Sequence, residues 1–325
     1  MTRLPTSDVR PDRTTILAFV GVVIFGAVNA IAVRQIVTEL APFWAAATRF
    51  LAAGAIMAAV VVATRRPFPK GRSFGGAVVY GAVGFTGSYA LIYQALRETP
   101  AGTTMVIVAL APLMTFGLAI VQGQERFRSQ GLLGALVALA GVAVVFADQT
   151  SADVPIGSLL LVVLGTACIA ESGVVAKWIP KSDPVATNAV GMATGGGLLL
   201  ALSIVAAEPW AIPSQSATWL AVGYLVIFGS VVMFALYLFA LRRWTASAVS
   251  YVTLLMPLVT VPLAAILIGE RITPSLLIGG AIVLVGVYLG AFANIHRARV
   301  PTPSLPECLP ADDGLATPAV APPTR

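Results

Sequence analysis

Two ionisable side chains, Arg49 and Glu171, lie deep inside long apolar stretches of this sequence. A charge surrounded by hydrocarbon is costly, so such residues usually pair or face a water-filled cavity, where they carry protons or bind ligands. Glu171 has small neighbours at Ala167 and Ser172, which leave room beside its carboxylate. Two interpretations stay open for Glu171. It carries a proton or pairs with a cationic ligand group such as an ammonium, or it forms a structural ion pair with Arg49 or Lys177.

Two prolines 145 residues apart, Pro112 and Pro257, interrupt apolar runs in the two halves of the chain. Proline removes one backbone hydrogen bond and frees the carbonyl four residues earlier, here those of Val108 and Thr253. Free carbonyls at membrane depth are tolerated where protein or water meets them, so paired broken helices indicate a ligand cavity. A simple packing kink is the alternative. The candidate cavity residues are Asn29, Tyr89, Tyr93, Pro112, Thr115, Glu171, Tyr224, Ser250, Thr253 and Pro257.

The composition places these residues in a membrane protein. Hydrophobic residues make up 58% of the 325, charged residues only 10%, and the mean hydropathy is +0.91. The apolar runs are longer than barrel strands need and lack their alternation, so the spans are helices. The predicted fold class is an all-α polytopic membrane protein with ten transmembrane helices. We expect them near 14–35, 41–63, 74–96, 101–122, 130–147, 156–177, 185–206, 217–240, 246–268 and 275–294.

The basic residues sort by side of the membrane. With a cytoplasmic N-terminus, most of the twenty Lys and Arg residues fall on the cytoplasmic side, and the positive-inside rule then predicts that both termini are cytoplasmic. This placement accounts for the net charge of +6 without nucleic acid, so no nucleic-acid partner is expected. A signal peptide cleaved near Asn29 is the competing interpretation of the first span, but apolar sequence continues through Val33.

The two halves of the chain repeat one pattern. Ala95-Leu96-Arg97 returns as Ala240-Leu241-Arg242, and Glu125-Arg126 returns as Glu270-Arg271. Each half carries five predicted spans, and with an odd number the second half enters the membrane from the opposite face. Such inverted repeats have two near-equivalent packings, one open to each side, which is the physical basis of alternating-access transport.

Other chemistry finds little support in the sequence. Cys168 lies in the sixth span and Cys308 in the tail, so no disulfide is expected, and the lone His296 makes no metal site. Inversion puts Glu125-Arg126 and Glu270-Arg271 on opposite faces, where they cannot form one active site. We therefore expect no enzyme activity and no cofactor. A receptor or scaffold would need a soluble sensing domain, and the connections are too short for one.

The repeated AL…A…P pattern is followed by Gln124-Glu125-Arg126 in the first half and by Gly269-Glu270-Arg271 in the second. Asn29 and Arg34 lie in the first span, and Arg49-Phe50 lies in the second. In these motifs the sequence resembles the EamA-like branch of the drug/metabolite transporter superfamily. The sequence departs from that pattern at Gln124, where glycine is usual. The resemblance implies a ten-helix inner-membrane carrier whose central cavity is lined by spans 1, 3, 4, 6, 8 and 9. Such carriers commonly export amino acids or related metabolites.

These observations give a domain plan and a function. The plan is a cytoplasmic segment 1–13, EamA-like repeats at 14–147 and 156–294, and a disordered cytoplasmic tail 295–325. The expected function is inner-membrane export of amino acids or related small metabolites by alternating access. The expected partners are a small-molecule substrate and the lipid bilayer, with coupling to protons. A nucleotide-sugar or drug carrier of the same superfamily, or a membrane protein that transports nothing, is the alternative.

Overall fold

The computed structural model describes residues 12–124, 127, 129–151, 154–180, 182–244, 246–250 and 252–292. All regular structure in these ranges is helical, as the sequence predicted. The first half contains α1 (Arg13–Ile36), α2 (Pro42–Ala63), α3 (Arg72–Gly81), η1 (Ala82–Gly87), α4 (Ser88–Ala95), α5 (Ala101–Val108), α6 (Ala111–Val121) and α7 (Ser129–Ser151). The second half contains α8 (Ile156–Trp178), α9 (Pro184–Val205), α10 (Ser216–Val226), η2 (Ile227–Val232), α11 (Met233–Arg243), α12 (Ala246–Ser250), α13 (Val252–Ile268) and α14 (Pro274–Phe292). Glu125, Arg126, His296, Cys308 and the tail lie outside the described residues.

Seven helical segments of the described chain are long and apolar enough to cross a membrane. They are α1, α2, α3–η1–α4, α5–α6, α8, α9 and α10–η2–α11. Three further apolar helices are shorter, Ser129–Val145, Leu255–Ile268 and Pro274–Gly286. These ten segments fall where the hydropathy pattern predicts spans.

The fourth predicted span breaks earlier than its proline implies. Helix α5 ends at Val108 and α6 starts at Ala111, so Pro112 lies in the first turn of a new helix. A proline is well tolerated there, because the N–H that it lacks would have no helical partner. Pro257 behaves differently, since it stays inside α13 together with Pro262. The two prolines match in sequence, but their helices differ.

The third and eighth spans each contain a π-helix, η1 and η2. Their bounds differ by 145 residues at both ends, the offset that separates Pro112 from Pro257. A π-helix is rare and often marks a functional site, because its wider turn leaves backbone groups free of the regular ladder. Because the two π-helices occupy the same position in the two repeats, they indicate that a functional site lies near residues 82–87 and 227–232.

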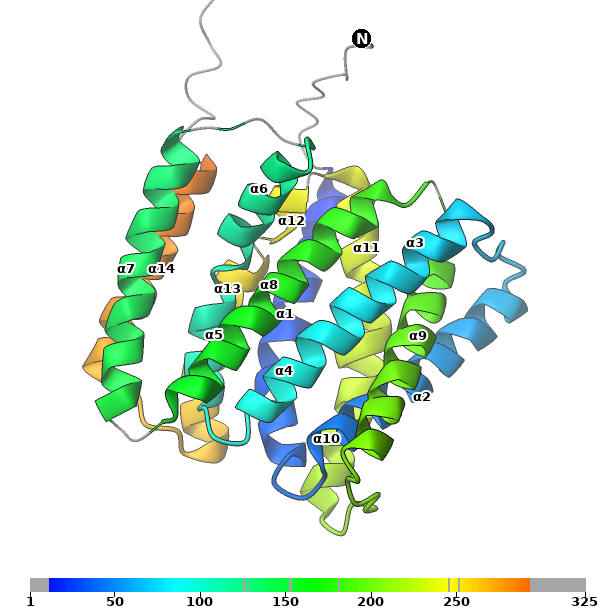
Figure 1. Cartoon of the computed structure of the whole chain (residues 1–325), viewed down its shortest axis with the longest axis horizontal. Coiled ribbons are helices and arrows are strands. Elements are labelled where there is room, and N and C mark those ends of the chain that lie inside the picture. The colour runs from blue at the N-terminus through cyan, green and yellow to red at the C-terminus, as the bar shows by residue number, and fades with distance from the viewer. Residues whose placement is uncertain are drawn as a thin grey trace, which may run out of the picture. The chain divides into compact units, whose positions relative to one another are not determined.

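Helices α7 and α14, the predicted fifth and tenth spans, pack mainly on each other at one edge of the bundle (Figure 1). Glycines let their backbones approach. A Cβ at Gly141 would lie 2.6 Å from the carbonyl oxygen of Gly279, and one at Gly286 would lie 2.4 Å from the amide nitrogen of Ala138. Close approach of small residues is the usual way in which membrane helices associate. The two helices therefore form a peripheral pair.

Helices α2 and α9 form a second glycine-mediated pair, and α9 also packs on α3 and η1. A Cβ at Gly81 would lie 2.3 Å from the carbonyl oxygen of Gly191, and one at Gly195 would lie 2.3 Å from the side chain of Phe85. Gly191 and Gly195 thus lie on the packing face of the seventh span. Gly197 faces open space.

The central helices interlock across the two halves. Helix α1 packs on α10, α11 and α13, whereas α8 packs on α3, η1, α4 and α6. The first span of each half therefore contacts the third and fourth spans of the other half. This exchange places the middle of the protein at an interface that both halves build.

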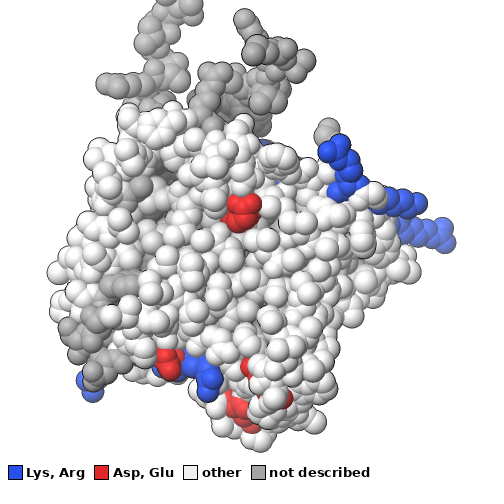
Figure 2. Space-filling view, in the orientation of Figure 1, with Lys and Arg blue, Asp and Glu red and all other residues white. Residues whose placement is uncertain are grey.

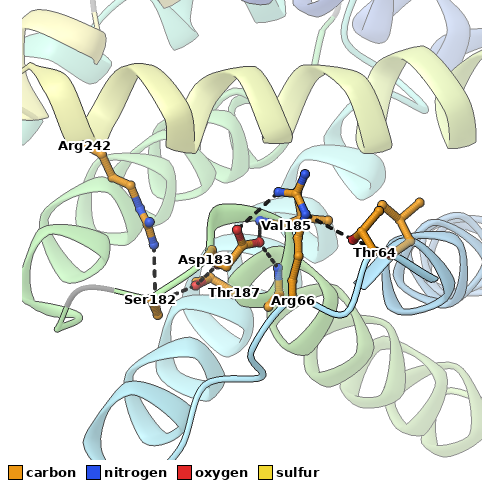
Figure 3. Close-up of polar contacts among 9 residues, drawn as sticks. Thr64, Arg66, Ser182, Asp183, Val185, Thr187 and Arg242 are labelled. Atoms are coloured by element: carbon orange, nitrogen blue, oxygen red, sulfur yellow. Dashed lines mark hydrogen bonds and ion pairs between the residues drawn. The ribbon is translucent and has the colours of Figure 1, made fainter. Parts of the chain in front are cut away.

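Charged groups lie toward the two ends of the bundle. Figure 2 shows a face that is almost entirely uncharged between those ends, interrupted by one acidic patch. At one end, Asp183 caps the start of α9 and pairs with Arg66 at 3.2 Å (Figure 3). Arg242 on α11 donates to Ser182 beside it. These contacts join the α2–α3 and α8–α9 connections to α11.

Candidate functional site

A cavity of about 120 Å³ lies among the central helices, and both halves of the chain line it. Its walls come from α1, α3–η1–α4, α5, α8, α11 and α13. These belong to the predicted spans 1, 3, 4, 6, 8 and 9, the six that the resemblance implied.

The lining is apolar and aromatic, with a few hydroxyl and amide groups. Four tyrosines line the cavity, together with one asparagine, two serines and one threonine; these are Tyr80, Tyr89, Tyr93, Tyr237, Asn29, Ser88, Ser172 and Thr253. No Asp, Glu, Lys or Arg is among the described lining residues. A pocket of this kind, apolar with a few placed polar groups, is typical of small-molecule sites.

Four of the ten candidate residues from the sequence meet in this lining: Asn29, Tyr89, Tyr93 and Thr253. Tyr224 lies behind it, where its hydroxyl donates to the carbonyl oxygen of Phe25 at 2.7 Å. Thr115 is buried within α6, and Ser250 ends α12, where its carbonyl oxygen accepts from the hydroxyl of Thr253. These side chains are placed by bonds to the protein backbone or by burial and do not border the cavity.

The two candidate prolines also lie away from the cavity. Pro112 starts α6, and Pro257 lines a separate hollow of about 360 Å³ between α13 and α14. That hollow is bordered by Pro262 and Leu276 and is almost wholly apolar. In this conformation, Pro257 therefore contributes to helix packing at the edge of the bundle.

Arg49 on α2 is held in the core beside the cavity, with only 1% of its surface exposed. Its Nε donates to the hydroxyl of Ser230 at 2.7 Å, and its Nη2 donates to the carbonyl oxygen of Gly229 at 2.7 Å. Its Nη1 donates to the hydroxyl of Tyr93 at 3.1 Å. The guanidinium also lies over the ring of Tyr89, 5.1 Å from its centroid, in a cation–π arrangement. The arginine therefore connects η2 to the cavity wall.

The π-helix η2 supplies the acceptors for this network. The carbonyl oxygen of Gly229 accepts from Arg49 and also from the side-chain amide of Asn29 at 3.3 Å. A side chain at Gly229 would collide with Asn29, because its Cβ would lie 2.2 Å from Oδ1. The sequence predicted that Arg49 needs an acceptor, but it did not indicate the π-helix η2. The glycines of the third and eighth spans mark its position, but they do not distinguish a π-helix from an α-helix.

The same arrangement recurs at η1 with different residues. Gly84 of η1 lies against Ser172 on α8, as Gly229 of η2 lies against Asn29 on α1. Arg49 of α2 donates hydrogen bonds to η2. At η1, the ring of Phe85 packs against α9 instead, 3.2 Å from the position of a Cβ on Gly191. The repeats therefore share a backbone plan and differ in charge.

Glu171 lies outside the cavity lining. Its two carboxylate oxygens accept from the side-chain amide of Gln122 at 2.9 and 2.8 Å, and it is half-buried between α6 and α8. The structural pair with Arg49 that the sequence left open is not formed, because Arg49 bonds to Ser230, Gly229 and Tyr93. The sequence did not indicate Gln122 as the partner, because it follows the end of a different helix, α6.

Comparisons with known proteins agree on one family. The family model of the EamA-like transporter family matches residues 13–147 and 156–291. A WAT1-related chloroplastic protein of Arabidopsis thaliana, At3g02690, is 27% identical over 81% of this chain, which spans 66% of that protein. The uncharacterized inner membrane transporter YedA of Escherichia coli (strain K12) is 27% identical over 71% of this chain and 76% of its own length.

Two further similarities add to this. A probable terminal-alkyne amino-acid exporter of Streptantibioticus cattleyicolor is 28% identical over 71% of this chain and 77% of its own length. One solved crystal structure shares the fold with a TM-score of 0.66 at 20% identity, and the match covers 89% of this chain and 100% of that one. Because the family model covers both halves, the chain belongs to the EamA-like transporter family and is a membrane transporter of that type.

Proposed function

We propose that this protein exports amino acids or related small metabolites across the inner membrane by alternating access. The observation that carries the proposal is the central cavity, which is lined by corresponding spans of both halves. A site at the interface of two repeats can be exposed to either side when one repeat rocks against the other. The name of the Streptantibioticus relative, a probable amino-acid exporter, favours this substrate class.

The proposed architecture is ten transmembrane helices in two inverted repeats of five. The seven long apolar segments, together with the three shorter apolar helices, support this count. The exchanged packing of α1 and α8, each on the third and fourth spans of the other half, supports an inverted relation. The matching bounds of η1 and η2 support the equivalence of the two repeats.

We assign the basic end of the bundle to the cytoplasm. Arg66, Arg242 and Arg243 lie there, at the α2–α3 connection and the end of α11, as the positive-inside rule requires of cytoplasmic segments. After both native cysteines are replaced by serine, a cysteine at Ser73 in the first turn of α3 should react only from the cytoplasm, and one at Ser214 before α10 only from outside. Reaction of both from one face would contradict the inverted arrangement.

Within this transporter, Asn29, Tyr89, Tyr93 and Thr253 form the substrate site, and Glu171 is the proton-coupling residue. Thr115, Tyr224 and Ser250 support the cavity helices, and Pro112 and Pro257 permit the fourth and ninth spans to bend. Reconstitution into liposomes tests the function. Labelled amino acids should exchange across the membrane, and a Tyr89→Ala variant should lose this exchange. Absence of flux for every amino acid would reject the substrate class.

A further inference from the structure

The charge of Arg49 has no carboxylate partner among the described residues. The ion pairs found there join Arg34 to Glu270, Arg66 to Asp183 and Arg243 to Asp12. Every acceptor of Arg49 is a neutral oxygen. Removing an ion from water costs several kcal/mol even after relaxation, and neutral acceptors compensate only part of this. The core of the transporter therefore holds a positive charge that no carboxylate of the described residues neutralises.

The hydroxyl of Tyr93 connects this charge to the cavity. Its oxygen accepts from Nη1 of Arg49, so its own proton is left to donate, and no acceptor for that proton is found among the described residues. Tyr93 lines the cavity, whereas Arg49 lies one layer behind it. A hydroxyl polarised by a cation on one side is a strong donor to an anion on the other.

A second hollow, toward the basic end of the bundle, is also lined by positively charged side chains. It measures about 380 Å³, and Lys177 and Arg242 are among its lining residues. Its lining begins one helical turn beyond the cavity on two helices. Ser172 and Tyr237 line the cavity, and residues one turn further along α8 and α11, Ala176 and Leu241, line the hollow. A positively lined approach to a low-dielectric site raises the local concentration of anions.

From these contacts we infer that the cavity binds a ligand that bears a carboxylate, which accepts a hydrogen bond from Tyr93 and is neutralised by Arg49 behind it. The inference rests on the proposed transport function, because it takes the central cavity as the substrate site. Anionic carboxylates such as benzoate and zwitterionic ones such as amino acids fit this description. A purely cationic ligand does not, because no described acidic side chain lines the cavity and the guanidinium of Arg49 bonds to Tyr93 in its wall.

The size and walls of the cavity narrow the ligand further. A volume of about 120 Å³ approaches that of cavities known to accept a benzene ring. The rings of Phe85, Tyr89 and Phe234 contact one another in the wall, with centroids 4.8 to 6.5 Å apart. The ligand that fits is therefore a small carboxylate with a compact apolar side group.

The test is equilibrium binding by purified protein in detergent, measured as ligand-induced thermal stabilisation. The probes are matched pairs: each of the common amino acids with its carboxamide, and benzoate with benzamide. We expect stabilisation by carboxylates and not by their amides. Because binding is measured without flux, a protein that binds carboxylates and transports nothing would reject the proposed function and leave this inference standing.

Three variants assign the effect. Arg49→Gln and Tyr93→Phe should each weaken binding of the stabilising carboxylate by roughly ten- to a hundredfold, the size of a lost charge-assisted hydrogen bond. Tyr93→Phe keeps the buried arginine, so it serves if Arg49→Gln fails to fold. Arg66→Gln removes the same charge at the end of the bundle and should bind as wild type. Equal stabilisation by acid and amide, no stabilisation by any carboxylate, or unchanged affinity in Tyr93→Phe overturns the inference.

Discussion

The carboxylate of Glu270 accepts a 2.7 Å hydrogen bond from the backbone N–H of Ala101, which joins the α13–α14 connection to the first turn of α5. Its second oxygen accepts from Gly102 at 3.0 Å, and Nε of Arg34 at the end of α1 lies 3.8 Å from the first oxygen. Arg34 also donates to the carbonyl oxygens of Leu96 and Thr99. One acidic residue thus holds three helix ends together, and its charge is favoured by the α5 dipole.

The first prediction concerns this contact. Glu270→Gln should loosen the end of the bundle, because a neutral amide replaces a carboxylate that accepts two backbone N–H bonds. Loss of a helix cap costs typically about 1 kcal/mol. A cysteine at Val33, which lines the cavity next to Arg34, should then react faster with a water-soluble maleimide. Equal rates in the Val33→Cys protein with and without Glu270→Gln would show that the contact does not restrict access.

The second prediction concerns proton coupling. Glu171→Gln keeps a side chain that can bond to Gln122 but removes the exchangeable charge. If Glu171 carries the proton, the variant should still exchange substrate across liposomes and lose the dependence of net flux on a pH gradient. Gln122→Leu, which removes the partner and leaves the acid, is the control that should retain this dependence. A wild-type response to the gradient in Glu171→Gln removes Glu171 from coupling.

A third prediction tests the close helix crossing. Gly81→Ala should destabilise the protein, because its Cβ would lie 2.3 Å from the carbonyl oxygen of Gly191 and two backbones would have to separate. Overpacking of this kind costs roughly 1–3 kcal/mol. Gly197→Ala on α9 is the matched control, since its Cβ would meet nothing within 4 Å. Thermal unfolding in detergent should lower the melting temperature of the first variant only, and equal melting temperatures would contradict this packing.

A fourth prediction uses pH. Hydrogen bonds from Ser214 lower the pKa of Glu39, in the α1–α2 connection, from its ordinary value of 4.5 to about 2. A carboxylate with a lowered pKa stabilises the folded state fully above its unfolded pKa, and the contribution disappears as the pH falls from 4.5 to 2. The melting temperatures of wild type and Glu39→Gln should therefore differ at pH 7 and converge at low pH. A difference that is constant with pH would assign the effect to packing.

Much of the fold followed from the sequence. Hydropathy gave the helical class and the positions of the apolar segments, because each span must satisfy its backbone internally and therefore carries a long uncharged run. The duplicated motifs around Pro112 and Pro257 gave the two repeats, and the family assignment is confirmed. These features are local or periodic, so they are legible in one chain.

The site was only partly legible. Asn29 and Tyr93 were found because polar side chains in apolar spans are few. The π-helices were not found, since an i→i+5 turn uses the same residue types as an α-helix and depends on tertiary contacts. The partners of Arg49 and Glu171 were not found either. Gly229 and Gln122 come from other spans, far away in the chain. Glu171, which the sequence placed among the candidate cavity residues, lies outside the lining.

The π-helices also bear on how the length of this chain varies among its relatives. Each π-turn takes one residue more than the α-turn it replaces. A relative that builds the third and eighth spans as plain α-helices should therefore align with a one-residue gap inside 82–87 and another inside 227–232. A relative with only one of the gaps would have kept a bulge in one repeat alone. Counting residues between flanking motifs would then date the two bulges relative to the duplication.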